Sequence, residues 1–144
     1  MLDATITVFN FCAADEKWYP SILHGADVEQ SDTTQATTRG QSNGGGVNLI
    51  IPCSRERVVQ TGAGGKSYTG PKVFSRSTGP ASLITFAPEC DFVYLGAWPT
   101  TEPLDDDDYD EGLYHELNRD YDDVYMIHSV AYFDLLPHFE IRGE

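Results

Sequence analysis

The chain has 144 residues, of which 40% are hydrophobic and 12% aromatic, and it carries a net charge of −14 at pH 7. This length suits one domain, residues 1–144, and excludes a multidomain enzyme, while the apolar content excludes a disordered tail. The negative charge excludes general affinity for the outside of duplex DNA, although it permits local contact. The first residues lack a signal-peptide pattern and no apolar run could span a membrane, so we expect a protein that folds in the cytoplasm without a membrane partner.

The first third of the chain shows two strand patterns and then a polar segment. Residues 5–11 alternate β-branched or aromatic side chains with polar ones, which predicts a half-buried strand. Residues 18–28 predict a second extended segment, which Pro20 and Gly25 place at an edge or bend. Residues 29–46 are almost all Ser, Thr, Gln, Asn, Asp and Gly, and we expect them to form a long loop.

The middle of the chain predicts one short strand followed by a second long loop. Residues 47–52 form an apolar run that ends at a proline, and residues 58–60 favour brief pairing. We interpret residues 53–80 as a long loop. Its Gly, Ser and Thr content predicts that residues 61–80, like residues 29–46, are mobile in the isolated subunit and become ordered only against a neighbour.

The last part of the chain predicts further strands and one helix. Two strands separated by a turn are expected at 81–86 and 91–96, a short helix near 111–117 inside an acidic insert at 102–116, and a terminal hairpin at 124–133 and 138–142. Short strands, long loops and no βαβ alternation predict a mainly β fold, a small β-barrel or sandwich with at most one short helix.

One segment invites comparison with a nucleotide-binding loop. Residues 60–67 follow a strand-like pair of valines and end in Gly-Lys-Ser, as the phosphate-binding loop does. Gln60 stands where the first glycine is required, and Gly70 and Pro71 would stop the helix whose amides must face the phosphates. We therefore predict no nucleotide cofactor.

The acidic run from Asp105 to Glu111 resembles a calcium-binding loop, because hard cations prefer clustered carboxylates. With Asp106 as the first ligand, Glu111 replaces the required glycine and Leu117 replaces the final acidic ligand. The run is therefore interpreted as a solvated acidic loop, with weak adventitious binding of divalent cations as the alternative.

Histidines and cysteines show no catalytic or metal-binding spacing. His24, His115, His128 and His138 are isolated from one another, and no nucleophile motif surrounds any serine or cysteine. Cys12, Cys53 and Cys90 are too far apart for a CxxC pair, so reduced, buried thiols are expected. We predict that the protein is not an enzyme and has no catalytic, cofactor-binding or metal-binding residues.

Basic residues are concentrated in one part of the sequence. Six of them lie between Arg39 and Arg76 with a single acid, Glu56, so this stretch carries +5 and the remainder −19. Such segregation suggests opposite charges on different surfaces, which repeated copies could pair. The candidate interface or channel residues, facing carboxylates of a neighbouring chain or DNA phosphates, are Arg55, Arg57, Lys66, Lys72 and Arg76.

Several short segments resemble a group of small structural proteins encoded by bacteriophages. The similar segments are residues 6–10, 18–20, 23–25, 47–52, 91–96, 121–130, 133–134 and 137–143. Such proteins are encoded among the head and connector genes of long-tailed phages, and they are similar in size and strand content to head-closure (stopper) proteins. The two long loops and the acidic insert are more extended here than in that group.

This resemblance implies a non-enzymatic subunit of a homo-oligomeric ring in the virion neck, assembled in the host cytoplasm. The implied partners are a portal or adaptor protein on one side and a tail protein on the other, with contact to packaged DNA in the channel as a further expectation. Alternatives are a tail-completion or capsid-decoration protein, and an acidic β module that binds a host protein as a nucleic-acid mimic. A fourth alternative is a metal-dependent enzyme that uses the cluster from Asp105 to Glu111.

Overall fold

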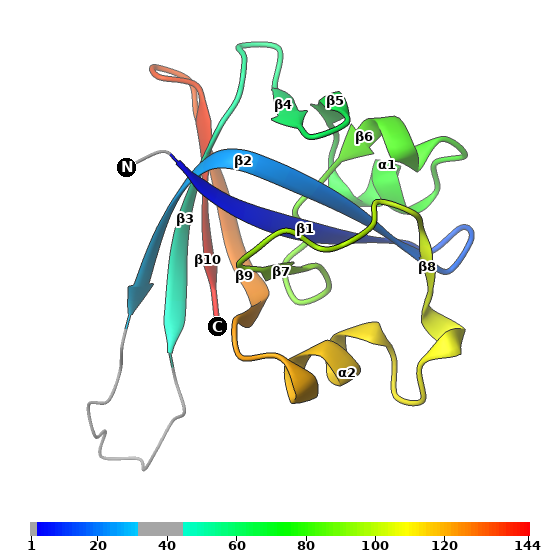
Figure 1. Ribbon diagram of the computed structural model, residues 1–144. Helices are drawn as coiled ribbons and strands as arrows, with labels where there is room; N and C mark the ends of the chain where they lie inside the picture. The colour runs from blue at the N-terminus through cyan, green and yellow to red at the C-terminus, as the bar shows by residue number, and fades with distance from the viewer. Residues whose placement is uncertain (1–2, 32–44) are drawn as a thin grey trace.

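Two long strands at the N-terminus form one wall of the protein and then separate. In the computed structural model, which describes residues 3–31 and 45–144, β1 (Ala4–Cys12) and β2 (Lys17–Ser31) pair antiparallel (Figure 1). The register shifts where Gly25, at φ 92°, forms a bulge, and β2 then pairs with β3 (Gly46–Pro52). A glycine bulge bends a strand at a barrel corner, so the bend predicted at Gly25 is confirmed.

Six strands close into a β-barrel. Their order is β1, β7 (Phe92–Tyr94), β9 (Val124–Phe133), β10 (His138–Gly143), β3 and β2, and β2 returns to β1. Every pairing around the ring is antiparallel, and β8 (Leu104–Asp105) extends the sheet at the start of β2. The mainly β fold is confirmed, a barrel is found rather than a sandwich, and the predicted terminal hairpin is β9 and β10.

The barrel interior is filled by side chains from all six strands. Each strand contributes at least one fully buried apolar residue, namely Ile6, Leu23, Leu49, Val93, Ile127 and Phe139. Burial of one such side chain is worth about 1.5–3 kcal/mol, so this interior accounts for much of the stability of the fold. The barrel is therefore a solid scaffold, and its functional groups lie on the outside.

A second core lies on the outer surface of the barrel wall. Phe9 of β1 stacks on Phe92 of β7 with ring centroids 4.6 Å apart. The helix α2 (Leu113–Asp120) covers these rings with Leu113 and Leu117. The Leu113 amide donates to Oδ1 of Asp106 at 2.9 Å, and Asp106 belongs to the 3₁₀ turn η2 (Asp106–Asp108). This side chain from outside the helix therefore caps its N-terminus. The predicted helix in the acidic insert is confirmed.

The prediction of a long loop at residues 53–80 is wrong. This segment contains β4 (Val58–Thr61), β5 (Gly64–Tyr68) and the short helix α1 (Pro71–Ser75), followed by the 3₁₀ turn η1 (Pro80–Ser82) and by β6 (Leu83–Ile84). Val59 and Phe74 are buried, so scattered apolar residues order a segment that is otherwise rich in Gly and Ser. The Gly62 amide donates to Ile22 O at 2.9 Å, which ties the small sheet β4-β5-β6 to the barrel.

The other predicted loop is shorter than expected. Residues 29–31 continue β2 and Gly46 begins β3, with Gln30 opposite Val47. The remaining part of the predicted loop, residues 32–44, lies outside the described residues. The strands predicted at 81–86 and 91–96 are also shorter, and appear as β6 and β7.

Candidate interaction surfaces

An apolar hairpin tip projects from one end of the barrel, between β9 and β10. Leu135 is 86% exposed and Leu136 is 76% exposed, and Phe133 beside them is 43% exposed. Figure 1 shows the hairpin reaching beyond the barrel wall at the upper left. Adjacent large apolar side chains at such exposure are unusual on a monomeric surface and mark interaction sites. We call residues 133–136 the hairpin tip.

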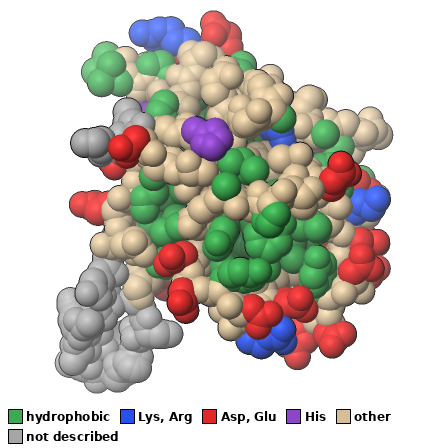
Figure 2. All heavy atoms as spheres, viewed as in Figure 1, with side chains coloured by type: hydrophobic (Ala, Val, Ile, Leu, Met, Phe, Trp, Pro, Cys, Tyr) green, Lys and Arg blue, Asp and Glu red, His purple; other side chains and the backbone are tan. Residues whose placement is uncertain are grey.

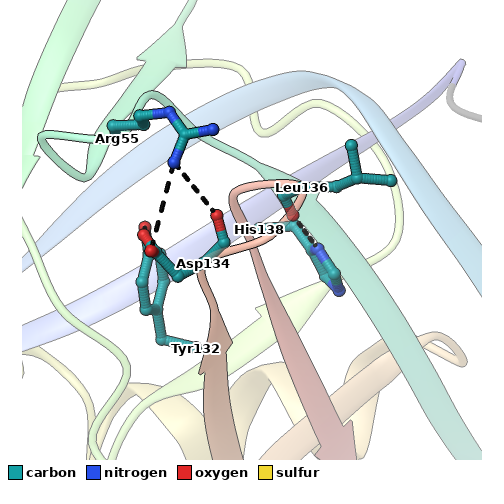
Figure 3. A network of polar contacts seen from close by, with 5 residues as sticks. All are labelled: Arg55, Tyr132, Asp134, Leu136 and His138. Atoms are coloured by element: carbon teal, nitrogen blue, oxygen red, sulfur yellow. Dashed lines mark hydrogen bonds and ion pairs between the residues drawn. The ribbon is translucent and has the colours of Figure 1, made fainter.

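Contacts at its base hold the hairpin tip in one conformation. The Cys53 amide donates to Pro137 O at 3.2 Å, and Phe133 stacks on the His138 ring at 5.1 Å between centroids. His138 Nδ1 lies 2.5 Å from Leu136 O, as Figure 3 shows. The tip is therefore presented in a fixed geometry, and its leucines point away from the barrel.

The proton state of His138 matters for this geometry. Its Nε2 lies 2.9 Å from Glu140 Oε2 while its Nδ1 faces the Leu136 carbonyl. Both neighbours are acceptors, so both ring nitrogens donate only when the imidazole is protonated. The Glu140 carboxylate and then the Leu136 carbonyl raise the pKa of His138 above its ordinary value.

Two of the predicted basic residues lie beside the hairpin tip. Arg55 Nη1 is 4.0 Å from Asp134 Oδ2 and donates to Asp134 O at 3.4 Å (Figure 3). The Arg57 guanidinium lies 4.2 Å from the centroid of the Tyr132 ring, and the Tyr132 hydroxyl donates to Asp134 Oδ1 at 3.1 Å. Both arginines are exposed, so they form a basic border around an apolar tip.

The prediction of an interface or channel role does not suit Lys66. Its side chain is only 9% exposed and its Nζ donates to Ser21 Oγ at 2.7 Å. Burial lowers the pKa of this amine. Lys66 lies opposite Val59 in the hairpin of β4 and β5, so its side chain packs between the small sheet and the barrel. The Gly-Lys-Ser motif therefore belongs to a β-hairpin and not to a strand–loop–helix nucleotide site.

The last two predicted basic residues form a separate surface on α1. Lys72 and Arg76 are exposed on this helix and its C-cap, and Val73 between them is 50% exposed. Among the described residues, Lys72 and Arg76 form no ion pair, unlike Arg55. We call Lys72, Val73 and Arg76 the basic surface. Figure 1 shows α1 and the hairpin tip on opposite sides of the barrel top.

Sequence reasoning missed an aromatic surface, formed by Tyr94, Trp98 and Tyr121. The three rings contact one another edge to face, with centroids 5.7–5.9 Å apart. Trp98 also packs on Phe9, which anchors the surface to the outer core. Tyr121 is 44% exposed. Its members come from β7, the following loop and the end of α2, so no local motif could have revealed them.

One glycine makes the aromatic surface possible. Gly96 has φ 153°, and a Cβ built there would lie 3.0 Å from Cε2 of the Tyr94 ring. The Thr7 hydroxyl donates to Gly96 O at 2.8 Å and accepts the Trp98 amide at 2.9 Å. Together these contacts fix Tyr94 and Trp98 beside each other.

Acidic residues border the aromatic surface. Asp120, Asp122 and Asp123 flank Tyr121 in the chain, and the first two are exposed. Figure 2 shows hydrophobic side chains gathered on this face of the molecule, with acidic side chains along its lower and right edges. Such a combination favours a partner that offers both apolar and cationic groups.

The acidic insert and the cysteines show no metal geometry. Asp105 and Asp106 accept hydrogen bonds from the Asp107 amide and the Trp18 indole, at 3.0 and 2.7 Å, so they hold local structure. Within residues 3–31 and 45–144, no three His, Cys, Asp or Glu side chains come together as a metal site requires. All three cysteines are free. Cys12 is buried as expected, but Cys53 is only half-buried, and the expectation of burial is wrong for Cys90, which is exposed.

A cleft beside α2 has a volume of about 230 Å³ and brings Cys90, Asp106 and His115 to its walls. Asp106 Oδ1 already accepts from the Trp18 indole and from the Leu113 amide, and His115 makes its ring contact with Tyr114. The structure shows no hydrogen bond among Cys90, Asp106 and His115, so these three side chains do not form a nucleophile with an oriented base.

A protein-family model matches the chain over its whole length, residues 1–144, with the description "Family of unknown function (DUF6751)". The chain belongs to this family. No curated protein and no solved structure matches it. Among the described residues, no helix of the DUF6751 chain has the length and apolarity to cross a membrane.

Proposed function

We propose that this protein is a non-enzymatic structural subunit of a phage virion, a head–tail connector or stopper that forms a ring in the neck. The observation that carries the proposal is the hairpin tip, where Leu135 and Leu136 are held exposed at the end of a closed barrel. The resemblance of short segments to phage structural proteins, among them residues 133–134 and 137–143 on either side of the two leucines, supports it.

The physical basis is that a ring subunit needs a rigid core and preformed contact points. Burying the two tip leucines against a partner would contribute about 3–6 kcal/mol, and preorganisation of the tip keeps the entropic cost of ordering small. Its contacts with Cys53 and His138 supply that preorganisation. The tip is thus built to insert into an apolar recess of another virion component.

The proposed partners are further copies of the chain, a portal or adaptor protein, and a tail protein. Arg55 and Arg57 border the hairpin tip and would face carboxylates of one of these partners, or phosphates of packaged DNA in the channel. The proposed location is the virion neck, with assembly in the host cytoplasm.

The test is a phage whose copy of this gene carries a nonsense mutation. The proposal predicts particles with complete capsids that lack tails or have lost their DNA, and antibody labelling at the neck of wild-type virions. Normal tailed, infectious particles from the mutant would reject it. Label on the capsid surface or at the tail tip would instead support a decoration or tail-completion protein.

Point variants locate the contact. Leu135→Ser with Leu136→Ser, and separately Arg55→Glu with Arg57→Glu, should leave the isolated fold nearly unchanged, since exposed substitutions usually cost less than about 0.5 kcal/mol. Both variants should reduce the yield of tailed, DNA-filled particles. Ala63→Ser, an exposed change in the turn between β4 and β5, is the matched control and should assemble normally.

A further inference from the structure

We propose that the basic surface of one copy docks on the aromatic surface of the next copy, head to tail. This inference rests on the proposed function, because it names the contact that would close the ring. It assigns opposite roles to two surfaces of the same chain: α1 supplies the cations, and the region around Tyr121 supplies the rings and carboxylates.

The two surfaces match in both polarity and charge. Val73 on the basic surface and Tyr121 on the aromatic surface are each about half exposed, at 50% and 44%. Lys72 and Arg76 flank Val73, whereas Asp122 and Asp123 follow Tyr121 in the chain. Asp120, which precedes Tyr121, is already paired with Arg119 at 2.8 Å. An apolar centre with a cationic border would therefore meet an apolar centre with an anionic border.

The aromatic rings themselves favour cations as well. A guanidinium is attracted to the faces of Trp and Tyr, and Arg is the residue that most often makes this contact. The chain already uses it within one molecule, where Arg57 lies over Tyr132. Arg76 has no ion-pair partner among the described residues, so it is available to make the equivalent contact with a neighbour.

Placement of the surfaces favours a head-to-tail contact over a two-fold dimer. Figure 1 shows α1 at the upper right of the barrel and α2, which precedes Tyr121, below it. One chain therefore cannot join its own two surfaces. A two-fold dimer could form both unlike pairings only if the two surfaces lay on one face of each chain, because both pairings would share a single interface. Pairing of unlike surfaces instead propagates from copy to copy and closes into a ring when the rotation permits.

Charge reversal tests the pairing. Lys72→Glu with Arg76→Glu makes the basic surface acidic, and Asp122→Lys with Asp123→Lys makes the border of the aromatic surface basic. Each pair alone should weaken self-association of the full chain by about tenfold or more, measured by sedimentation equilibrium and native mass spectrometry at low ionic strength. All four changes in one chain should restore association, because the surfaces are again opposite in charge.

Matched variants separate this contact from general charge effects. Lys17→Glu with Arg142→Glu reverses two exposed bases outside the proposed surfaces and changes the net charge as much as the first pair does, and it should leave self-association unchanged. Tyr121→Ala should weaken association while Tyr121→Phe retains it, because no hydrogen bond of the Tyr121 hydroxyl contributes to the contact. Circular dichroism and thermal unfolding confirm that each variant is folded.

Two results would overturn the inference. The first is a wild-type chain that stays monomeric up to its solubility limit. The second is a variant with all four charge reversals that does not regain the association lost in the two double variants. Failure of the proposed function looks different. If self-association responds to the charge reversals as predicted but the protein is absent from the virion neck, the docking inference stands and the connector role is wrong. If the protein is found in the neck but the charge reversals do not affect its ring, the connector role stands and the docking inference is wrong.

Discussion

Asn10 Nδ2 donates to Asp91 Oδ2 at 2.9 Å across the barrel wall, and both side chains are completely buried. The same carboxylate accepts the Ala87 amide at Oδ2 and the Phe11 amide at Oδ1, at 2.9 and 3.0 Å. Asn10 also donates to Thr85 O. This one acidic side chain therefore ties β1 to the segment between β6 and β7, and every group that contacts it through these bonds is a donor.

Replacing the carboxylate by an amide should destabilise the fold. Asp91→Asn turns an NH₂ group toward a donor that now bonds the carboxylate, and losing a buried hydrogen bond to a charged group costs about 2–4 kcal/mol. Urea unfolding measures it. Asp110→Asn, an exposed change, is the control and should stay within about 0.5 kcal/mol of wild type. Equal stability of Asp91→Asn and wild type would show that the network contributes nothing.

Asp91 should also give stability a specific pH dependence. Burial raises the pKa of Asp91 to about 6, against the opposing effect of its hydrogen-bond donors. A carboxyl group whose folded pKa exceeds its unfolded value stabilises most below the unfolded pKa, and that contribution is lost as pH rises through the folded pKa. The stability difference between wild type and Asp91→Asn should therefore shrink between pH 4 and pH 7. A difference that stays constant over this range contradicts the assignment.

His138 should titrate above its ordinary pKa because Glu140 and the Leu136 carbonyl accept from its ring. The contribution of this protonated ring to the order of the hairpin tip is complete at low pH and is lost as pH rises through the raised pKa. Glu140→Gln should lower the pKa of His138 in an NMR titration. Glu111→Gln, an exposed acid on α2's side of the molecule, serves as the control. Identical His138 titrations in wild type and Glu140→Gln would disprove the coupling.

Gly96 should be the glycine on which the aromatic surface depends. Gly96→Ala forces a Cβ to within 3.0 Å of the Tyr94 ring at an unfavourable φ of 153°, and we expect a cost of about 1–3 kcal/mol with altered fluorescence of Trp98. Gly79→Ala is the matched control, since a Cβ at Gly79 meets nothing within 4 Å. Similar stability and spectra for the two variants would mean that Tyr94 does not pack across Gly96.

Sequence patterns predicted those parts of the fold in which neighbours in the chain carry the signal. The alternation in residues 5–11 correctly predicted the strand β1, but the prediction that it is half-buried is wrong, because residues 6–10 are all buried where the outer core covers the second face of this strand. The apolar pattern of residues 124–133 likewise predicted β9. Composition misled at residues 53–80, because Val59 and Phe74 are spaced among Gly and Ser yet are enough to anchor a small sheet and a helix.

Sites built from distant segments carry no such local signal. Charge counting found the exposed bases Arg55, Arg57, Lys72 and Arg76, but it could not separate them from Lys66, whose burial depends on the pairing of β5 with β4. The aromatic surface joins Tyr94 to Tyr121 through tertiary packing alone. Closure of the sheet into a barrel likewise depends on the bulge at Gly25 and on the long-range pairing of β1 with β7.

The most direct test of the connector proposal is cryo-electron microscopy of the virion that encodes this chain. We predict a ring of six-stranded barrels between portal and tail, with each hairpin tip inserted into an adjacent component and each α1 facing the Tyr121 region of the next copy. A neck reconstruction in which every ring is assigned to other proteins, with this chain absent from the purified virion, would contradict the account.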